Sequence, residues 1–190
     1  MSDKIYCYPD SDVLVNKLGI RDLDQLQMIE RKLTMIRLAE LVNHPIKGNF
    51  DLEHLQRIHY YIFQDIYEWA GKIRTVDIAK GNMFCNVRFI DIQADEIFGR
   101  LKRENYLLGT SREVFVKKCA YYFSEINALH PFREGNGRTQ REFIRSLASA
   151  NGYRLMFQKA GEEEMLLASQ KSFLCDYTAM EDLFNKITEP

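Results

Sequence analysis

Residues 130–141 read HPFREGNGRTQR and lie between two segments with helical periodicity. Gly135, Asn136 and Gly137 come immediately before the second segment. Gly and Asn tolerate the positive φ angles that turn successive backbone N–H groups to one side of the chain. A loop of this kind at a helix N-terminus binds anions, because its N–H groups and the helix dipole both favour negative charge. The stretch therefore predicts a phosphate-binding nest within a largely helical protein.

Charged residues around this nest complete a candidate catalytic set. Arg138 and Arg141 are three positions apart, so both guanidinium groups can reach one side of a bound polyphosphate. Glu134 is a hard oxygen ligand that can hold Mg²⁺ against those phosphates. His130 can take a proton near neutrality, since an unperturbed imidazole has a pKa of ~6.5. Each residue alone has a structural explanation, but base, acid, nest and paired Arg within twelve residues indicate a functional site.

Apolar residues recur with helical spacing over most of the chain. The spacing predicts helices at about residues 22–42, 52–66, 91–106, 110–128, 138–150, 162–173 and 178–187. Asp51 is a candidate N-cap and Gly71 a stop signal for the second of these helices. Thr110 with Glu113, and Thr178 with Glu181, have capping-box spacing. His54 and His59 fall on an ordinary amphipathic helix, and we interpret both as structural.

The segment at residues 73–90 has a different character. Two β-rich runs flank Lys80-Gly81-Asn82-Met83, which predicts a hairpin projecting from the helical body. The runs contain Ile73, Val76 and Ile78 before the turn, and Val87, Phe89 and Ile90 after it. An ordinary connecting turn is the alternative. With no repeat and no linker, we expect residues 1–190 to form one mainly α domain with a small β-hairpin.

The composition bounds the class of protein. An apolar share of 46 %, with 12 Phe and 10 Tyr, can supply one sizeable core. A net charge of −1 gives no electrostatic reason to expect binding to nucleic acid or to an anionic membrane. Cys7, Cys85, Cys119 and Cys175 lie far apart, so we expect reduced thiols rather than a disulfide framework or zinc site. No signal-like N-terminus and no run near ~18 apolar residues is present, and we expect a cytoplasmic protein.

A resemblance emerges from the same stretch. Residues 130–141 fill every defined position of the Fic family signature, H-P-F-x-[DE]-G-N-G-R-x-x-R. Further similar residues are Ile58-His59, Phe63, Asp65-Ile66-Tyr67, Trp69-Ala70-Gly71, Arg74, Val76-Asp77-Ile78 and Asn127-Ala128-Leu129. The resemblance covers nearly the whole chain and is strongest over about residues 51–152. It implies a Fic fold, a helical bundle with a β-hairpin flap near the active-site loop and with N- and C-terminal helices packed on that core.

The resemblance also implies an activity, the transfer of AMP from ATP to a Tyr, Ser or Thr hydroxyl of a target protein. His130 would deprotonate the hydroxyl, and Glu134 would hold Mg²⁺ at the phosphates. The backbone of residues 135–137 and the Asn136 side chain would cradle the α- and β-phosphates. Phe132 would face inward and anchor the loop.

Two further implications concern the phosphates and the target. Arg138 and Arg141 would bind the β- and γ-phosphates. In the family the hairpin is a flap that pairs with an extended stretch of the target. Its tip here would be Lys80, Gly81, Asn82, Met83, Phe84 and Cys85. Gly137 matches the nucleotide transferases, since relatives that move a phosphate group carry Lys there; phosphocholine and UMP transfer also occur in the family.

Many Fic proteins carry an inhibitory helix with the pattern [ST]-x-x-x-E-[GN], and no Ser or Thr of this chain has Glu four residues later. We therefore expect a separate small antitoxin to supply a Glu near Arg141. The resemblance favours a bacterial toxin acting on type II topoisomerase, either DNA gyrase or topoisomerase IV.

Two alternatives stay open. The chain could be the Fic domain of a secreted effector that modifies host small GTPases, or a non-catalytic nucleotide-binding module. Intact His130 and Glu134 argue against the module, and the neutral charge argues against a DNA-binding regulator.

Overall fold

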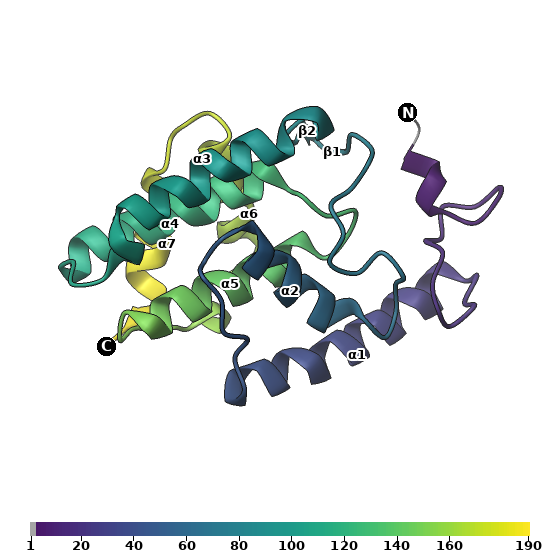
Figure 1. Cartoon of the computed structure of the whole chain (residues 1–190), viewed down its shortest axis with the longest axis horizontal. Helices are drawn as coiled ribbons and strands as arrows, with labels where there is room; N and C mark the ends of the chain where they lie inside the picture. Colours follow the sequence, from purple (N-terminus) through teal and green to yellow (C-terminus); the bar gives the residue numbers. More distant parts are fainter. Residues whose placement is uncertain (1–2) are drawn as a thin grey trace.

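Helices dominate the computed structural model, which describes residues 3–190 (Figure 1). The α-helices of this part are α1 (Leu23–Asn43), α2 (Leu52–Phe63), α3 (Ile90–Arg103), α4 (Arg112–Leu129), α5 (Asn136–Ala150), α6 (Glu162–Ser172) and α7 (Thr178–Ile187). Short 3₁₀ turns are η1 (Asp3–Tyr6), η2 (Val87–Phe89), η3 (Asn105–Leu107) and η4 (Phe157–Lys159). Strands β1 (Ala79–Lys80) and β2 (Asn82–Met83) pair antiparallel, as do β3 (Arg154–Leu155) and β4 (Thr188–Glu189). The predicted mainly α class with a small hairpin is confirmed.

The helices pack around α4 and α5, which flank the motif loop. α3, α5 and α7 contact α4, α2 lies against α5, and α1 covers α2 along one edge of the molecule (Figure 1). Large aromatic residues fill the space between them, among them the fully buried Phe115, Phe123, Phe143 and Phe184. Helices at both ends of the sequence therefore contribute to the same core that supports the motif loop.

Two of the predicted helix starts are confirmed by capping contacts. The Asp22 carboxylate accepts the N–H of Gln25 at 2.8 Å, and the Asp51 carboxylate accepts that of His54 at 2.8 Å. α2 ends at Phe63, earlier than predicted, because the N–H of Ile66 bonds to the carbonyl of Phe63 in a tight turn. This turn directs residues 64–72 back toward the motif loop.

Both predicted capping boxes are wrong. Ser111 is the N-cap of α4, since its hydroxyl accepts the N–H of Val114 at 3.4 Å. The Thr110 hydroxyl instead donates to the carbonyl of Leu107 and closes the preceding turn. At α7, Tyr177 is the N-cap without a side-chain bond.

The hairpin is smaller than the β-rich runs predicted. Each strand has two residues, with Lys80 opposite Asn82 and Gly81 at φ +80° between them. Residues 73–78 are irregular, and residues 87–90 form η2 and the start of α3. The reason is local: the Asp77 carboxylate accepts the N–H of Val87 at 2.8 Å, so a side chain rather than a strand partner satisfies the backbone there.

Other expectations agree with the structure. α5 begins at Asn136, two residues before the predicted start, and Gly152 follows it in the left-handed region at φ +81°. All four cysteines are free thiols. Within residues 3–190, no helix is both long and apolar enough to cross a bilayer.

Candidate active site

The motif loop turns sharply between α4 and α5, and its first residue is the predicted base. His130 is the C-cap of α4 and has a left-handed backbone, at φ 46° and ψ 59°. Its carbonyl accepts a hydrogen bond from Nε of Arg74 at 2.8 Å. A side chain other than Gly occupies the left-handed region at an energetic cost, which the surrounding contacts offset.

The His130 ring is held in one tautomer. Nδ1 lies 3.1 Å from the carbonyl oxygen of Asn127, and because a carbonyl only accepts, Nδ1 carries the proton. Nε2 is therefore the ring's proton acceptor. The ring of Phe84 stacks on the imidazole with centroids 3.6 Å apart. Burial lowers the pKa of His130 to about 4, with help from the positive charges of Arg74 and Lys80, so the ring is neutral at pH 7.

Gly135 begins the nest. It is the N-cap of α5 at φ 82°, and a Cβ there would lie 2.1 Å from Cζ of Phe63, so only glycine fits. The first N–H groups of an α-helix have no partner inside the helix, which leaves those of the first turn of α5 available to an anion.

The Asn136 side chain forms hydrogen bonds within the motif loop itself. Its Oδ1 accepts the N–H of Phe132 at 2.9 Å, and its Nδ2 donates to the carbonyl of Phe132 at 2.7 Å. The residue is 5 % exposed. Both polar ends of the amide thus shape the loop, and contact of this side chain with a phosphate stays a prediction.

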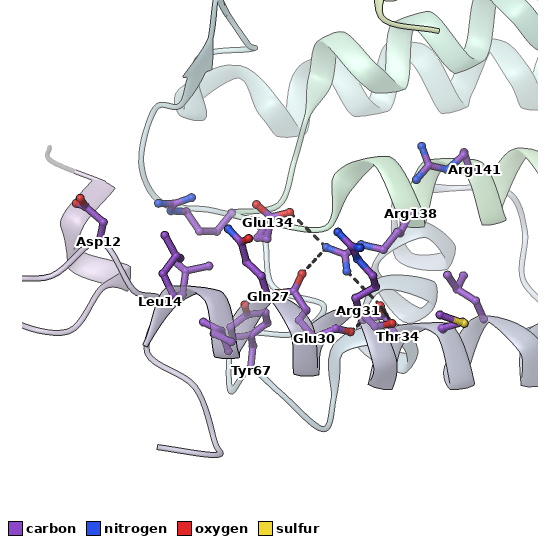
Figure 2. A pocket seen from close by; sticks show the side chains of 15 residues that line it. Asp12, Leu14, Gln27, Glu30, Arg31, Thr34, Tyr67, Glu134, Arg138 and Arg141 are labelled. Atoms are coloured by element: carbon purple, nitrogen blue, oxygen red, sulfur yellow. Dashed lines mark hydrogen bonds and ion pairs between the residues drawn. The ribbon is translucent and has the colours of Figure 1, made fainter. Parts of the chain in front are cut away.

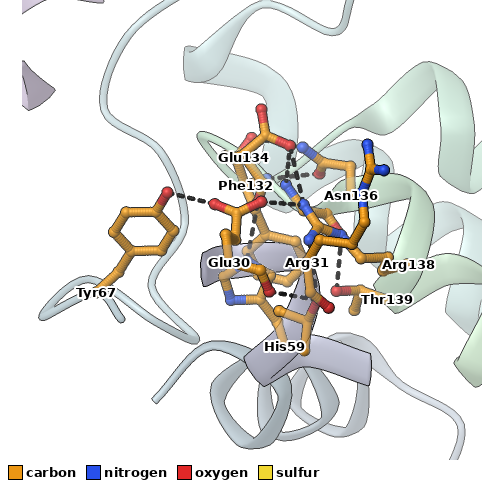
Figure 3. A network of polar contacts seen from close by, with 11 residues as sticks. Glu30, Arg31, His59, Tyr67, Phe132, Glu134, Asn136, Arg138 and Thr139 are labelled. Atoms are coloured by element: carbon orange, nitrogen blue, oxygen red, sulfur yellow. Dashed lines mark hydrogen bonds and ion pairs between the residues drawn. The ribbon is translucent and has the colours of Figure 1, made fainter. Parts of the chain in front are cut away.

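Phe132 faces inward, as predicted, and packs against His59, whose predicted structural role the contacts confirm. The rings of Phe132 and His59 stack with centroids 3.9 Å apart. Nδ1 of His59 accepts the N–H of Gly71 at 2.8 Å, so Nε2 carries the proton and donates to the carbonyl of Glu134 at 3.0 Å. Burial lowers the pKa of His59 to about 3. His59 is thus a neutral residue that supports the motif loop from below by stacking and hydrogen bonding (Figure 3).

Arg74 connects the flap to the motif loop. Its side chain is fully buried and donates to the carbonyls of His130, Val76 (2.6 Å) and Cys85. The N–H of Cys85 bonds to the carbonyl of Ala128 at 2.9 Å. The end of the hairpin and the start of the catalytic loop are therefore tied to one guanidinium.

The six predicted tip residues divide into two groups. Lys80, Gly81, Asn82 and Met83 are exposed. Phe84 and Cys85 are half-buried against the catalytic loop, where Phe84 covers the ring of the base. The hairpin thus lies next to His130, with a free edge turned to solvent.

The two motif arginines differ in their contacts. Nη2 of Arg138 lies 2.6 Å from Oε1 of Glu30 and 3.4 Å from Oε1 of Glu134, and Nη1 donates to Oγ1 of Thr34 at 3.1 Å (Figure 3). Within residues 3–190, the Arg141 side chain forms no hydrogen bond or ion pair, although burial lowers its pKa. Figure 2 shows Arg138 turned toward α1, with Arg141 farther along α5 and without a contact.

Both arginines line a cleft of about 650 Å³ between α1 and the motif. The polar side chains of its wall include Gln27, Glu30, Arg31, Thr34, Glu134, Arg138 and Arg141 (Figure 2). His130 does not line this cleft, so the base lies to one side of the cationic space.

Glu134 is accessible to a metal ion. Its side chain is 46 % exposed and accepts the N–H of Gly135 at 2.8 Å. No group of three or more metal-ligating side chains occurs in the part of the chain that the structure describes. A single carboxylate fits Mg²⁺, which commonly binds one or two carboxylates together with phosphate oxygens and water.

The sequence model of the Fic/DOC family matches residues 49–148. The chain belongs to this family. It is 42 % identical to the protein adenylyltransferase VbhT of Bartonella schoenbuchensis over 97 % of the chain, and spans 39 % of that relative's length. It is 37 % identical to the Escherichia coli K12 protein named "Probable protein adenylyltransferase Fic", covering 98 % of the chain and 96 % of that relative.

A solved structure agrees with the fold. The N-terminal Fic domain of a VirB-translocated Bep effector protein from Bartonella quintana, with bound ADP, superimposes with a TM-score of 0.94. It is 31 % identical, and the match covers 98 % of this chain and 95 % of that one. The Fic fold predicted from the sequence is confirmed, and the predicted enzyme class agrees with the names of the relatives.

Proposed function

We propose that this chain is a protein adenylyltransferase, which transfers AMP from ATP to a hydroxyl side chain of a target protein. One observation carries the proposal. His130 is a neutral ring with Nε2 free to accept a proton, and it lies just before an anion nest and a helix that carries two arginines. The names of the relatives, and the ADP bound to the Bep domain, support the same conclusion.

The reaction would proceed by in-line displacement at the α-phosphorus. The target hydroxyl oxygen forms a bond to that phosphorus as Nε2 of His130 takes its proton, and the bond to the β-phosphate breaks to release pyrophosphate. The first-turn N–H groups of α5 would stabilise the charge on the phosphate oxygens, and Arg138 and Arg141 the charge on the leaving group.

Magnesium is the cofactor we assign to Glu134. Glu134 would hold Mg²⁺, and the bound ion would offset the negative charge of the phosphates. Glu134 would then leave Arg138 and bind the metal. The loss of this contact should cost little free energy, because the two side chains are 3.4 Å apart.

The exposed tip residues 80–83 would dock the target by β-augmentation, with an extended target segment adding to the free edge of the hairpin. The N–H of Phe84 bonds to the carbonyl of Ile78, so the N–H of Met83 faces away from the partner strand. Met83→Pro removes this outward donor and should lower the rate of transfer to the target. The affinity for ATP should stay the same, which a calorimetric titration would check. Equal loss of both would contradict docking at this edge.

Restraint would come from a separate antitoxin that supplies a Glu to Arg141. Arg141 lines the cleft and has no ion partner among the described residues, so a carboxylate could pair with it. The purified chain should therefore be active by itself. An inert chain that gains activity when one of its own acidic residues is changed to Ala would contradict this proposal.

DNA gyrase or topoisomerase IV in the bacterial cytoplasm is our proposed target. A translocated effector that acts on host proteins is the second candidate, because the Bep domain with which the chain superimposes comes from a translocated protein. Labelling of purified gyrase against labelling of host-cell lysate would separate the two.

The test of the activity is label transfer from ATP with Mg²⁺, using the purified chain, bacterial lysate and gyrase. Parallel reactions carry radiolabel on the α- or the γ-phosphate. We expect protein-bound label only from the α-position, and its loss in His130→Ala. Label from the γ-position would instead mean phosphate transfer.

A further inference from the structure

Glu30 of α1 is the least exposed carboxylate among the contacts of the motif arginines. It lies outside residues 49–148, and its side chain is 12 % exposed. Oε1 bonds to Nη2 of Arg138 at 2.6 Å, and Oε2 accepts the hydroxyl of Tyr67. The two oxygens therefore have fixed partners on opposite sides (Figure 3).

The same turn of α1 supplies a second contact. Oγ1 of Thr34 accepts from Nη1 of Arg138 at 3.1 Å, and donates in turn to the carbonyl of Glu30 at 2.8 Å. The guanidinium also lies 4.7 Å over the ring of Phe63. Arg138 is thus held by α1 on one edge and by an aromatic ring on one face.

These contacts leave specific donors free. A guanidinium has five N–H groups. The contacts to Glu30 and Glu134 use the two on Nη2, and Thr34 uses one on Nη1. Thr34 and Glu30 take the edge formed by Nη1 and Nη2, and the Nε–H remains free. The Nη2–H that faces Glu134 at 3.4 Å lies on the same edge as the Nε–H, so these two donors suit two phosphate oxygens once Glu134 turns to the metal.

We propose that Glu30 is a positioning residue for Arg138, which fixes the guanidinium so that this edge faces the bound triphosphate. The inference rests on the proposed function and deepens it, because it gives the two motif arginines different tasks. Arg138 is oriented in advance and partly neutralised, whereas Arg141 keeps its whole charge for the phosphates. An N-terminal helix outside the family match is then part of the catalytic site.

The test uses a matched pair of glutamates on α1. Glu40 also contacts an arginine and a tyrosine, since it lies 3.1 Å from Nη1 of Arg37 and accepts the hydroxyl of Tyr61 at 2.8 Å. Glu40 does not touch the motif. Glu30→Gln and Glu40→Gln each remove one charge and keep the shape. Glu30→Gln should lower stability more, because Glu30 is 12 % exposed and Glu40 41 %.

We expect Glu30→Gln to lower kcat for transfer about 10-fold or more, with the KM for ATP changed less than 3-fold, because orientation is lost while Arg141 still binds the phosphates. Glu40→Gln should keep both constants. In nucleotide-free protein, the ¹⁵N NMR signals of the Arg138 Nη groups should be resolved in the wild type and in Glu40→Gln, and averaged by rotation in Glu30→Gln.

Other results would overturn the proposal. A wild-type kcat in Glu30→Gln, or a higher one, would mean that Glu30 stabilises the fold or restrains the enzyme. If Glu30→Gln does not fold, Tyr67→Phe removes the hydrogen bond to Oε2 and should lower kcat a few-fold, whereas Tyr61→Phe should not. If the wild type transfers no label, the proposed function fails, while the NMR comparison still decides whether Glu30 positions Arg138.

Discussion

At the scale of single residues, the site depends on histidines that are neutral when buried. His130 is neutral because burial and two nearby cations oppose its protonation, and His59 is neutral because it is sealed beneath the loop. His130 can accept a proton at Nε2, and His59 donates a hydrogen bond to the carbonyl of Glu134. The same physical cause therefore serves catalysis at one position and support at the other.

The low pKa of His130 predicts an unusual pH profile. With a pKa of about 4 in the free enzyme, kcat/KM for transfer should stay level from pH 7 to about pH 5 and fall only below that. An NMR titration of the ring in nucleotide-free protein should give the same midpoint. A fall centred near pH 6.5 would show that His130 is not desolvated as described.

Acid should also destabilise the fold through these rings. Burial lowers the pKa of His130 to about 4 and of His59 to about 3, whereas an unfolded chain protonates both near pH 6.5. The unfolded state binds more protons below pH 6.5, so the free energy of unfolding should fall by about 1.4 kcal/mol per pH unit for each ring as the pH drops toward 4. Urea titrations at pH 7 and pH 5 measure the loss, and His130→Ala should show a smaller one.

At the scale of elements, the hairpin and the catalytic loop are one unit joined by Arg74. A lysine keeps the charge but not the planar fork that reaches three carbonyls. Arg74→Lys should lower the free energy of unfolding by about 1–3 kcal/mol and speed hydrogen exchange in residues 78–86 and 128–131 together. Arg88→Lys, in the exposed part of the same segment, is the control. Unchanged exchange in both regions would contradict the coupling.

Helix starts and strands differ in how well the sequence predicts them. Asp51 could be predicted as an N-cap because capping depends on a side chain and the backbone three residues on. At the start of α4, Thr110 and Ser111 both carry a hydroxyl that could cap the helix. The Thr110 hydroxyl bonds to Leu107 in the preceding turn, so Ser111 is the N-cap. The prediction of longer strands from the β-rich runs was wrong, because the side chains of Asp77 and Arg74 bond to backbone groups that paired strands would use.

At the scale of the whole molecule, parts distant in sequence complete the site. The motif loop could be predicted because its functional residues are consecutive in the sequence. Glu30 could not, since it is 108 positions from Arg138 and only the packing of α1 against α2 brings them together. The hydrogen bonds of the Asn136 side chain could not be predicted for a related reason, because its partners are backbone groups of the loop itself.

The core shared by both ends of the chain gives a stability prediction. Phe184 of α7 is 0 % exposed and lies 5.3 Å from Phe123 of α4, ring to ring. Phe184→Ala should lower the free energy of unfolding by about 3–5 kcal/mol in urea titrations. Leu174→Ala, at a residue 83 % exposed, should change it by less than about 0.5 kcal/mol. Equal effects of the two changes would mean that α7 does not pack on α4 as described.

The most direct test of the central claim is the mass of the modified residue. Label-bearing protein from the ATP reaction is digested, and the modified peptide is analysed by tandem mass spectrometry, with His130→Ala in parallel. We expect one adenylyl group on a Tyr, Ser or Thr hydroxyl, absent in the variant. A phosphate in its place, or an adenylyl group that persists without His130, would contradict the account.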